Sequence, residues 1–140
     1  MRMRPTLTQN DVALMVAACH AKEKELGRTG TIAIVDFGGD LLFLIRPDKQ
    51  SPNSVDVAVR KAQTAAFRER PSSNLEARVK ERPGWLMFPN GLPMSGGVPL
   101  FYQGECVGGI AVSGIAEDDE VVALAGSAAF EAVQREVRTS

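Results

Sequence analysis

The hydrophobic positions of the chain follow a helical period in two of its stretches. Between Thr8 and Gly27 the apolar residues recur at steps of three, four or seven, which is one face of an α-helix. Their members are Val12, Met15, Val16, Cys19 and Leu26. A second stripe, which begins after Ser54, consists of Val55, Val59, Ala62, Ala66 and Phe67. We also expect a short helix over 75–80 and an apolar final helix that opens at Asp118, with Thr8 as an N-cap of the first helix.

Two pairs of strand-like runs lie between these helices. Residues 31–36 and 41–45 flank a Gly-Gly turn, and residues 98–102 and 106–112 flank a polar turn, so both pairs predict β-hairpins. Hairpins favour an antiparallel sheet, and we therefore predict one α/β (α+β) domain, residues 1–140, with helices packed on four to five antiparallel strands. Because the 41–45 run lacks alternation, we expect both of its faces to be covered.

Two further apolar segments suggest contacts outside a simple core. The final helix is apolar enough to be covered on more than one side. The segment Trp85-Leu86-Met87-Phe88, in a proline-rich stretch, either folds back onto the core or forms a subunit interface or pocket lid.

Charge and cysteine content narrow the class of protein. Sixteen basic and seventeen acidic residues give a net charge of -1, which does not favour nucleic-acid binding. No apolar run approaches the roughly 20 residues that span a bilayer, so we expect no membrane segment. The two cysteines lack a CxxC spacing, and we expect free thiols in a cytoplasmic protein.

Five short phrases occur in an order and spacing that resemble one known family. They are Ile34-Val35-Asp36 followed by Gly38-Gly39, Arg46-x-Asp48, Lys61-Ala62-x-Thr64-Ala65, Gly96-Gly97-x-Pro99-Leu100, and Val107-Gly108-Gly109-Ile110-Ala111-Val112-Ser113-Gly114 before Asp118-Asp119. Together they resemble the GlcG/HbpS family, a DUF336-type domain that is also related to the C-terminal domain of PduO-type proteins. The resemblance runs from about Leu7 to Phe130.

The resemblance implies a fold, an assembly and a range of functions. The fold is an α/β sandwich that forms homo-oligomers, often octamers. The functions are haem handling, association with corrinoid-linked proteins, and roles in catabolic operons for small acids such as glycolate.

A first hypothesis is reversible binding of haem or another tetrapyrrole. His20 is the only histidine, which argues against the common His-based metal clusters and catalytic triads, but one imidazole is enough for an axial haem ligand. The thiol of Cys106 is a second candidate ligand. Each also has a structural interpretation, His20 as an exposed residue at the edge of the helical stripe and Cys106 as a buried inert thiol. Gly96 and Gly97 permit either a tight turn or a close backbone approach to a ligand.

A second hypothesis is an isomerase, hydratase or lyase that acts on a small carboxylate metabolite. Arg46 is suited to bind a carboxylate, and Lys61, inside an Ala-rich helix, to pair with or polarise it. The base would be Asp36, Asp48 or Glu105. The structural alternative is an internal ion pair, Arg46–Asp48 or Lys61–Asp36.

A third hypothesis is a structural or sensory oligomer whose ligand only tunes assembly. The apolar final helix and the apolar 85–88 segment would suit such a protein.

Overall fold

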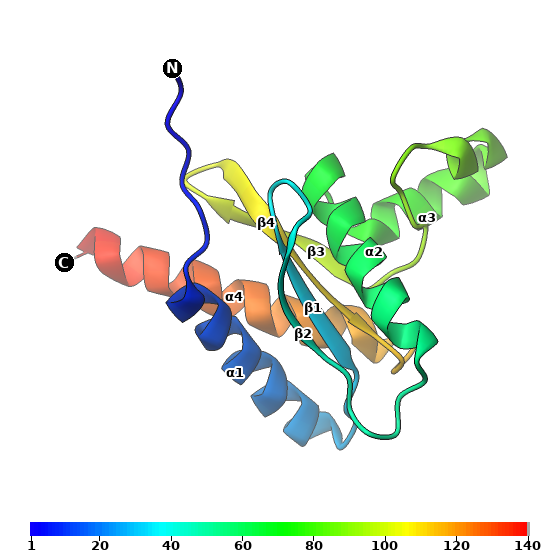
Figure 1. Ribbon diagram of the computed structural model, residues 1–140, viewed down its shortest axis with the longest axis horizontal. Helices are drawn as coiled ribbons and strands as arrows, with labels where there is room; N and C mark the ends of the chain where they lie inside the picture. Colours follow the sequence, from blue (N-terminus) through cyan, green and yellow to red (C-terminus); the bar gives the residue numbers. More distant parts are fainter. Residues whose placement is uncertain (140) are drawn as a thin grey trace.

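A computed structural model gives the structure of residues 1–139, with the side chains of residues 1–134 (Figure 1). The elements in chain order are α1 (Gln9–Leu26), β1 (Thr31–Asp36), β2 (Leu41–Ile45), α2 (Asn53–Arg68), α3 (Ser72–Glu81), the short 3₁₀ helix η1 (Pro83–Met87), β3 (Gly97–Tyr102), β4 (Glu105–Ser113) and α4 (Asp118–Thr139). All the helices and both hairpins predicted from the sequence are present, although α3 is longer than its predicted 75–80 range.

The four strands form one antiparallel sheet in the order β2-β1-β4-β3. The two hairpins join through β1 and β4, where Thr31 lies opposite Ser113 and Asp36 opposite Gly108. This arrangement confirms the predicted antiparallel α+β sheet. The central strand β1 is buried from Thr31 to Val35, which explains the uninterrupted apolar run over 32–35.

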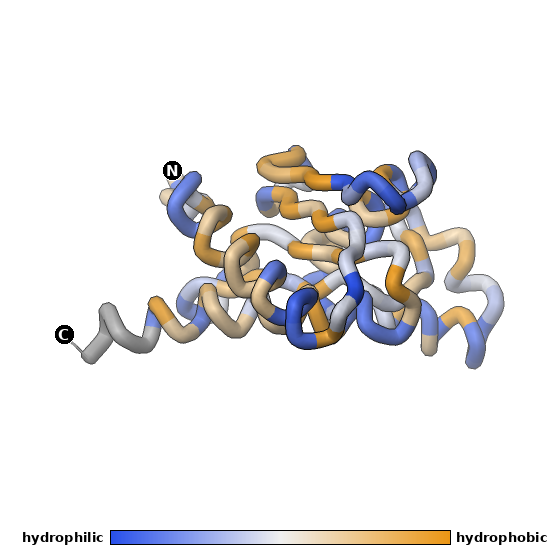
Figure 2. The backbone as a smooth tube through the Cα atoms, turned by 90° about the horizontal axis from the view of Figure 1, so that it is seen from below, coloured by the Kyte–Doolittle hydropathy of each residue, from blue (hydrophilic) through white to orange (hydrophobic). Residues whose placement is uncertain are grey.

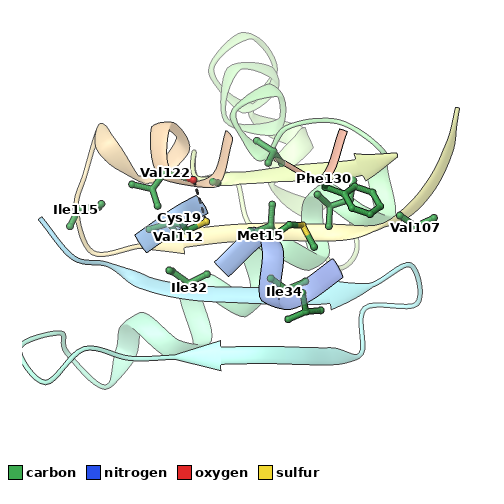
Figure 3. Close-up of a cluster of buried hydrophobic side chains, with 14 residues drawn as sticks. Met15, Cys19, Ile32, Ile34, Val107, Val112, Ile115, Val122 and Phe130 are labelled. Carbon is green, nitrogen blue, oxygen red and sulfur yellow. Dashed lines mark hydrogen bonds between the residues drawn. The ribbon is translucent and has the colours of Figure 1, made fainter. Parts of the chain in front are cut away.

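The helices cover both faces of the sheet. Helices α1 and α4 pack on each other and α4 contacts β3 and β4, whereas α2 lies across β1, β3 and β4 on the other face (Figure 1). The main core lies between α1, α4 and the sheet, where Met15, Ile34 and Val122 are fully buried (Figure 3). A smaller, alanine-rich core lies under α2, because small side chains let the helix backbone approach the strands closely.

Helix α1 begins at the predicted cap. The side chain of Thr8 accepts a hydrogen bond from the backbone N–H of Asp11 at 3.2 Å, and the Asp11 carboxylate accepts one from the N–H of Thr8 at 2.7 Å. This reciprocal capping box satisfies two donors that the first turn would otherwise leave unpaired.

Two predictions about covered apolar surfaces are wrong for the single chain. Strand β2 is an edge strand that pairs only with β1, so Leu41, Leu42 and Ile45 stay 39–49% exposed. Among the described side chains of α4, residues 118–134, the buried ones lie on one face, and Val121 and Leu124 on the other face are exposed.

The apolar 85–88 segment does not fold back onto the core. Leu86 is 59% exposed and Met87 85% exposed, because η1 lies outside α3 rather than over the sheet. The alternative of an interface or lid therefore stays open for this segment.

Hydrophobic stretches alternate with hydrophilic ones along the chain and are not gathered in one long segment (Figure 2). Among the described residues, no helix combines the length and the apolar character that a membrane crossing requires.

Candidate functional site

His20 lies on the outward side of α1, with its side chain half exposed. Its Nδ1 atom is 2.8 Å from the Oε1 atom of Glu23, one helical turn further along. A carboxylate at this distance holds the proton on Nδ1, because a carboxylate only accepts. The lone pair of the other ring nitrogen, Nε2, is then free to bind a metal ion, as in histidine ligands that a carboxylate orients.

The carboxylate of Glu23 is fixed from its other side. Glu23 is only 3% exposed, and its Oε2 atom accepts a hydrogen bond of 2.7 Å from the backbone N–H of Gly30. A buried carboxylate with two partners has little freedom to turn away. The imidazole is therefore positioned by a rigid neighbour, and half of its surface stays exposed to solvent.

Cys106 lies far from this arrangement, on the opposite face of the sheet. Cys106 is 2% exposed, and its thiol points toward α2, with Sγ 3.6 Å from the carbonyl oxygen of Ala66. Burial raises the pKa of the Cys106 thiol, so the thiol stays protonated at neutral pH. The geometry therefore favours the structural interpretation of Cys106, and the sheet separates it from His20 within one chain.

Cys19 is the second buried thiol, and it belongs to the main core. Burial, together with the nearby charge of Glu23, raises the pKa of Cys19 to about 12. Its Sγ–H donates to the carbonyl oxygen of Val122 at 3.4 Å (Figure 3). Cys19 thus links α1 to α4 as a neutral side chain.

Lys61 forms a buried ion pair with a residue that the sequence did not suggest. Its Nζ atom is 2.9 Å from Oδ2 of Asp119 and also donates to the carbonyl oxygen of Val112 at 3.2 Å. The other oxygen of Asp119 accepts from the N–H of Ile115 at 2.9 Å. The expected Lys61–Asp36 pair does not form, because the first turn of α4 lies closer to Lys61 than the β1–β2 turn does. The pair fastens α2, β4 and the start of α4 together.

Gly96 and Gly97 lie against this ion pair. A side chain at Gly97 would collide with the backbone carbonyl of Lys61, and one at Gly96 would meet the backbone oxygen of Val112. Gly96 also has a φ angle of 131°, which other residues rarely adopt. Close contact with the backbone of α2 therefore accounts for Gly97, whereas close contact with β4 and the positive φ angle account for Gly96.

The remaining candidates of the enzyme hypothesis are dispersed. Asp36 accepts hydrogen bonds from the N–H groups of Gly38 and Asp40 in the β1–β2 turn, while Arg46 follows β2 at the other end of that hairpin. Arg46 and Asp48 are exposed. Among the described residues, no hydrogen bond or ion pair joins any two of Arg46, Lys61, Asp36 and Asp48, so the predicted Arg46–Asp48 pair does not form either.

Glu105, the third candidate base, forms ion pairs with two arginines of the N-terminal segment. Its carboxylate lies 2.8 Å from the guanidinium of Arg2 and 3.5 Å from that of Arg4. It therefore holds the N-terminal segment against the β3–β4 hairpin.

Two of the cavities formed by the described residues involve none of these candidates. One, of about 410 Å³, lies between the N-terminal segment, the β3–β4 hairpin and α4, with Leu7, Val107 and Phe130 in its wall. The other, of about 740 Å³, lies at η1 and includes Trp85 and Phe88. In the part of the chain with described side chains, no three His, Cys, Asp or Glu residues approach closely enough to hold a metal ion.

Two residues that contact side chains discussed above were not predicted from the sequence. Glu23 orients His20 and stands three positions after it, a spacing that places both on one helical face and could have shown the contact. The guanidinium of Arg68 lies near the rings of Trp85 and Phe88, and no local sequence pattern predicts these contacts.

Comparison with known proteins agrees with the architecture. Residues 7–128 match the model of the HbpS-like family, described as haem degrading protein HbpS-like. Protein GlcG of Escherichia coli strain K12 is 30% identical over 114 residues, which are 81% of this chain and 85% of that protein.

Two solved structures extend the comparison. The crystal structure of HbpS has 33% identity and a TM-score of 0.83 and covers 91% of this chain and 92% of its own. A complex of PduOC with haem has 24% identity and a TM-score of 0.79 over 89% of this chain and 95% of its own, and so shows the same fold. On the strength of the family model and these relatives, the chain belongs to the HbpS-like family.

Proposed function

We propose that the protein binds haem or a related tetrapyrrole, and that Nε2 of His20 would be the atom that binds the iron. The observation that carries this proposal is the contact between His20 and the buried carboxylate of Glu23. It fixes the tautomer with Nδ1 protonated and leaves Nε2 directed away from its carboxylate partner. The donor set therefore fits a haem iron, for which one well-oriented imidazole suffices.

The family supports the same ligand class. Its model describes a haem degrading protein, and one solved protein of the same fold is a haem complex. Haem would supply a redox-active iron, and the residues of this chain would hold and orient it. Cys106 is the weaker candidate, because its buried thiol is protonated at neutral pH and lies behind the sheet.

A haem titration with matched variants tests this proposal. Wild-type protein and Cys106→Ala should show a saturable Soret shift at a fixed stoichiometry, whereas His20→Ala should bind haem at least about tenfold more weakly, as expected when a coordinate bond is lost. Lys24→Ala, an exposed substitution on the same helix, serves as the control and should behave as wild type. Unchanged affinity and an unchanged Soret band in His20→Ala would remove His20 as the ligand.

We also propose that the protein is a homo-oligomer, with an octamer as the expected size. Strand β2 exposes apolar side chains at Leu41, Leu42 and Ile45, and no charged residue interrupts this edge. An uninterrupted apolar edge strand normally pairs or is covered.

Multi-angle light scattering tests the assembly. The expected mass is a multiple of the 15.0 kDa chain at micromolar concentration. Leu42→Lys should lower the mass without unfolding the chain, while Lys49→Ala, an exposed change beyond the strand, should not. A monomeric wild-type protein would refute the proposal.

A further inference from the structure

The N-terminal segment closes one side of a cavity at the end of the sheet. The cavity, of about 410 Å³, is bounded by residues 5–7, the β3–β4 hairpin and the later turns of α4. Figure 1 shows the N-terminal segment passing beside that hairpin. Small-molecule sites have volumes of roughly 300–1,000 Å³. The cavity is therefore large enough for a small ring compound.

Apolar side chains form the floor of this cavity. Val107 is 2% exposed and Phe130 6% exposed, and both belong to its wall. Tyr102 and Val133 also belong to the wall but are 36% and 38% exposed, so they mark its open side. An apolar ring that enters from this side leaves water and contacts the floor, which is favourable.

Ion pairs and a hydrogen bond hold the N-terminal wall in place. The guanidinium groups of Arg2 and Arg4 lie 2.8 Å and 3.5 Å from the carboxylate of Glu105. Nη2 of Arg4 also donates to the carbonyl oxygen of Cys106 at 2.9 Å. Leu7, the next apolar residue of the segment, packs against β4. The cavity is therefore preformed in the chain, as small-molecule sites usually are.

One amide in the wall of the cavity has a fixed orientation. Nε2 of Gln134 donates to the carbonyl oxygens of Phe101 and Phe130, at 3.1 Å and 3.3 Å. A carbonyl oxygen only accepts, so both N–H groups of the amide are directed there. Among the described residues, no group donates to the other end of the amide, Oε1. Because Gln134 lines the cavity, Oε1 is available to accept a hydrogen bond from a ligand.

The charge of the wall narrows the class of ligand. Among the described residues that line the cavity, Asp11 is the one with a charge. Its carboxylate is held by the N–H and the hydroxyl of Thr8, at 2.7 Å and 2.9 Å. This fixed negative charge would repel an anion. An ammonium group would lose its hydration against the apolar floor, so the cavity favours a neutral molecule.

We propose that this cavity binds a small neutral aromatic molecule with one N–H or O–H donor, which donates to Oε1 of Gln134. The apolar floor contacts the ring, and the amide sets the orientation of the ligand. The site is distinct from the proposed iron ligand, because His20 lies nine positions after Asp11, which is about 14 Å along α1. The proposal does not depend on haem binding.

Indole and benzofuran separate the two contacts. The two compounds have the same bicyclic shape, but only indole carries an N–H donor. Isothermal titration calorimetry of the protein should show saturable binding of one indole per chain. Benzofuran should bind about two- to tenfold more weakly, as expected for the loss of one hydrogen bond. Benzoate, an anionic ring, should bind more weakly than indole because of Asp11.

Matched variants locate the bound indole. Val133→Trp places a large side chain at the open side of the cavity and should abolish indole binding. Val121→Trp is the same change at a position of α4 that is 39% exposed and outside the cavity, and it should bind indole as wild type does. Gln134→Met should bind indole and benzofuran with similar affinity, with circular dichroism confirming that it folds. His20→Ala should bind indole normally, so failure of the haem proposal leaves this test intact.

Any of three results would overturn the proposal. The first is the absence of saturable heat when indole is added to the wild-type protein. The second is equal indole affinity in wild type and the folded Val133→Trp variant. The third is a preference for indole over benzofuran that persists unchanged in Gln134→Met.

Discussion

Removal of the Lys61 charge tests how much the buried Lys61–Asp119 ion pair, which joins α2, β4 and α4, contributes to stability. Lys61 is 2% exposed and Asp119 7% exposed at the side chain, and their charged atoms are 2.9 Å apart. Lys61→Met would leave a buried carboxylate without its cation and the carbonyl oxygen of Val112 without its donor. Loss of one partner of a buried ion pair costs about 3–5 kcal/mol. That is a large part of the roughly 5–15 kcal/mol by which a domain is stable.

Urea unfolding gives the measurement. A loss of about 3 kcal/mol, with a slope of about 1–3 kcal/mol per molar urea, lowers the midpoint by about 1 M or more. The double variant Lys61→Met/Asp119→Leu removes both charges and should be less destabilised than the sum of the single changes. Arg60→Met, on the exposed side of the same helix, should stay within about 0.5 kcal/mol of wild type. A Lys61→Met midpoint close to wild type, or a strictly additive double variant, would refute this assignment.

Three further predictions concern α1. Glu23→Gln should weaken haem binding about 10- to 100-fold in a Soret titration, since it disturbs the orientation of the imidazole. The exposed Glu25→Gln control should bind haem as wild type does. Equal haem affinities of Glu23→Gln and wild type would contradict the role proposed for Glu23. The wild-type free energy of unfolding should fall between about pH 9 and pH 12, because the unfolded chain loses the Cys19 proton near its ordinary pKa of 9.0 whereas the folded chain keeps it to about 12. Denaturant titrations at pH 8 and pH 10 should show a smaller fall in Cys19→Ala, and an identical fall would refute this linkage. Thr8→Ala should lower the unfolding free energy by about 1 kcal/mol through loss of the cap, and no change in thermal melting would argue against the capping box.

The elements of the fold follow from local sequence patterns, but the site follows only in part. The stripe from Val12 to Leu26 predicts α1 because a 3.6-residue period identifies a buried helical face by itself. The position of His20 at the edge of that stripe also predicts its exposure. The partner of Lys61 was not predictable in this way, because Asp119 is 58 positions away and reaches Lys61 only through tertiary packing.

The errors in the prediction of covered surfaces have a related cause. The sequence of β2 shows that its side chains are apolar, but not that β2 is the edge strand of the sheet. A continuous apolar run has the same sequence whether a helix of the same chain or a second copy of the chain covers it. The exposed β2 surface is therefore informative only once the strand order is known.

Ligand rescue gives the sharpest test of whether Nε2 of His20 binds haem iron. The measurement is the absorption spectrum of ferric haem bound to His20→Gly, recorded without and with free imidazole. We expect the variant to lack the wild-type Soret band, and we expect imidazole to restore the band by filling the space of the missing ring. A wild-type Soret band in His20→Gly before imidazole is added would exclude His20 as the iron ligand.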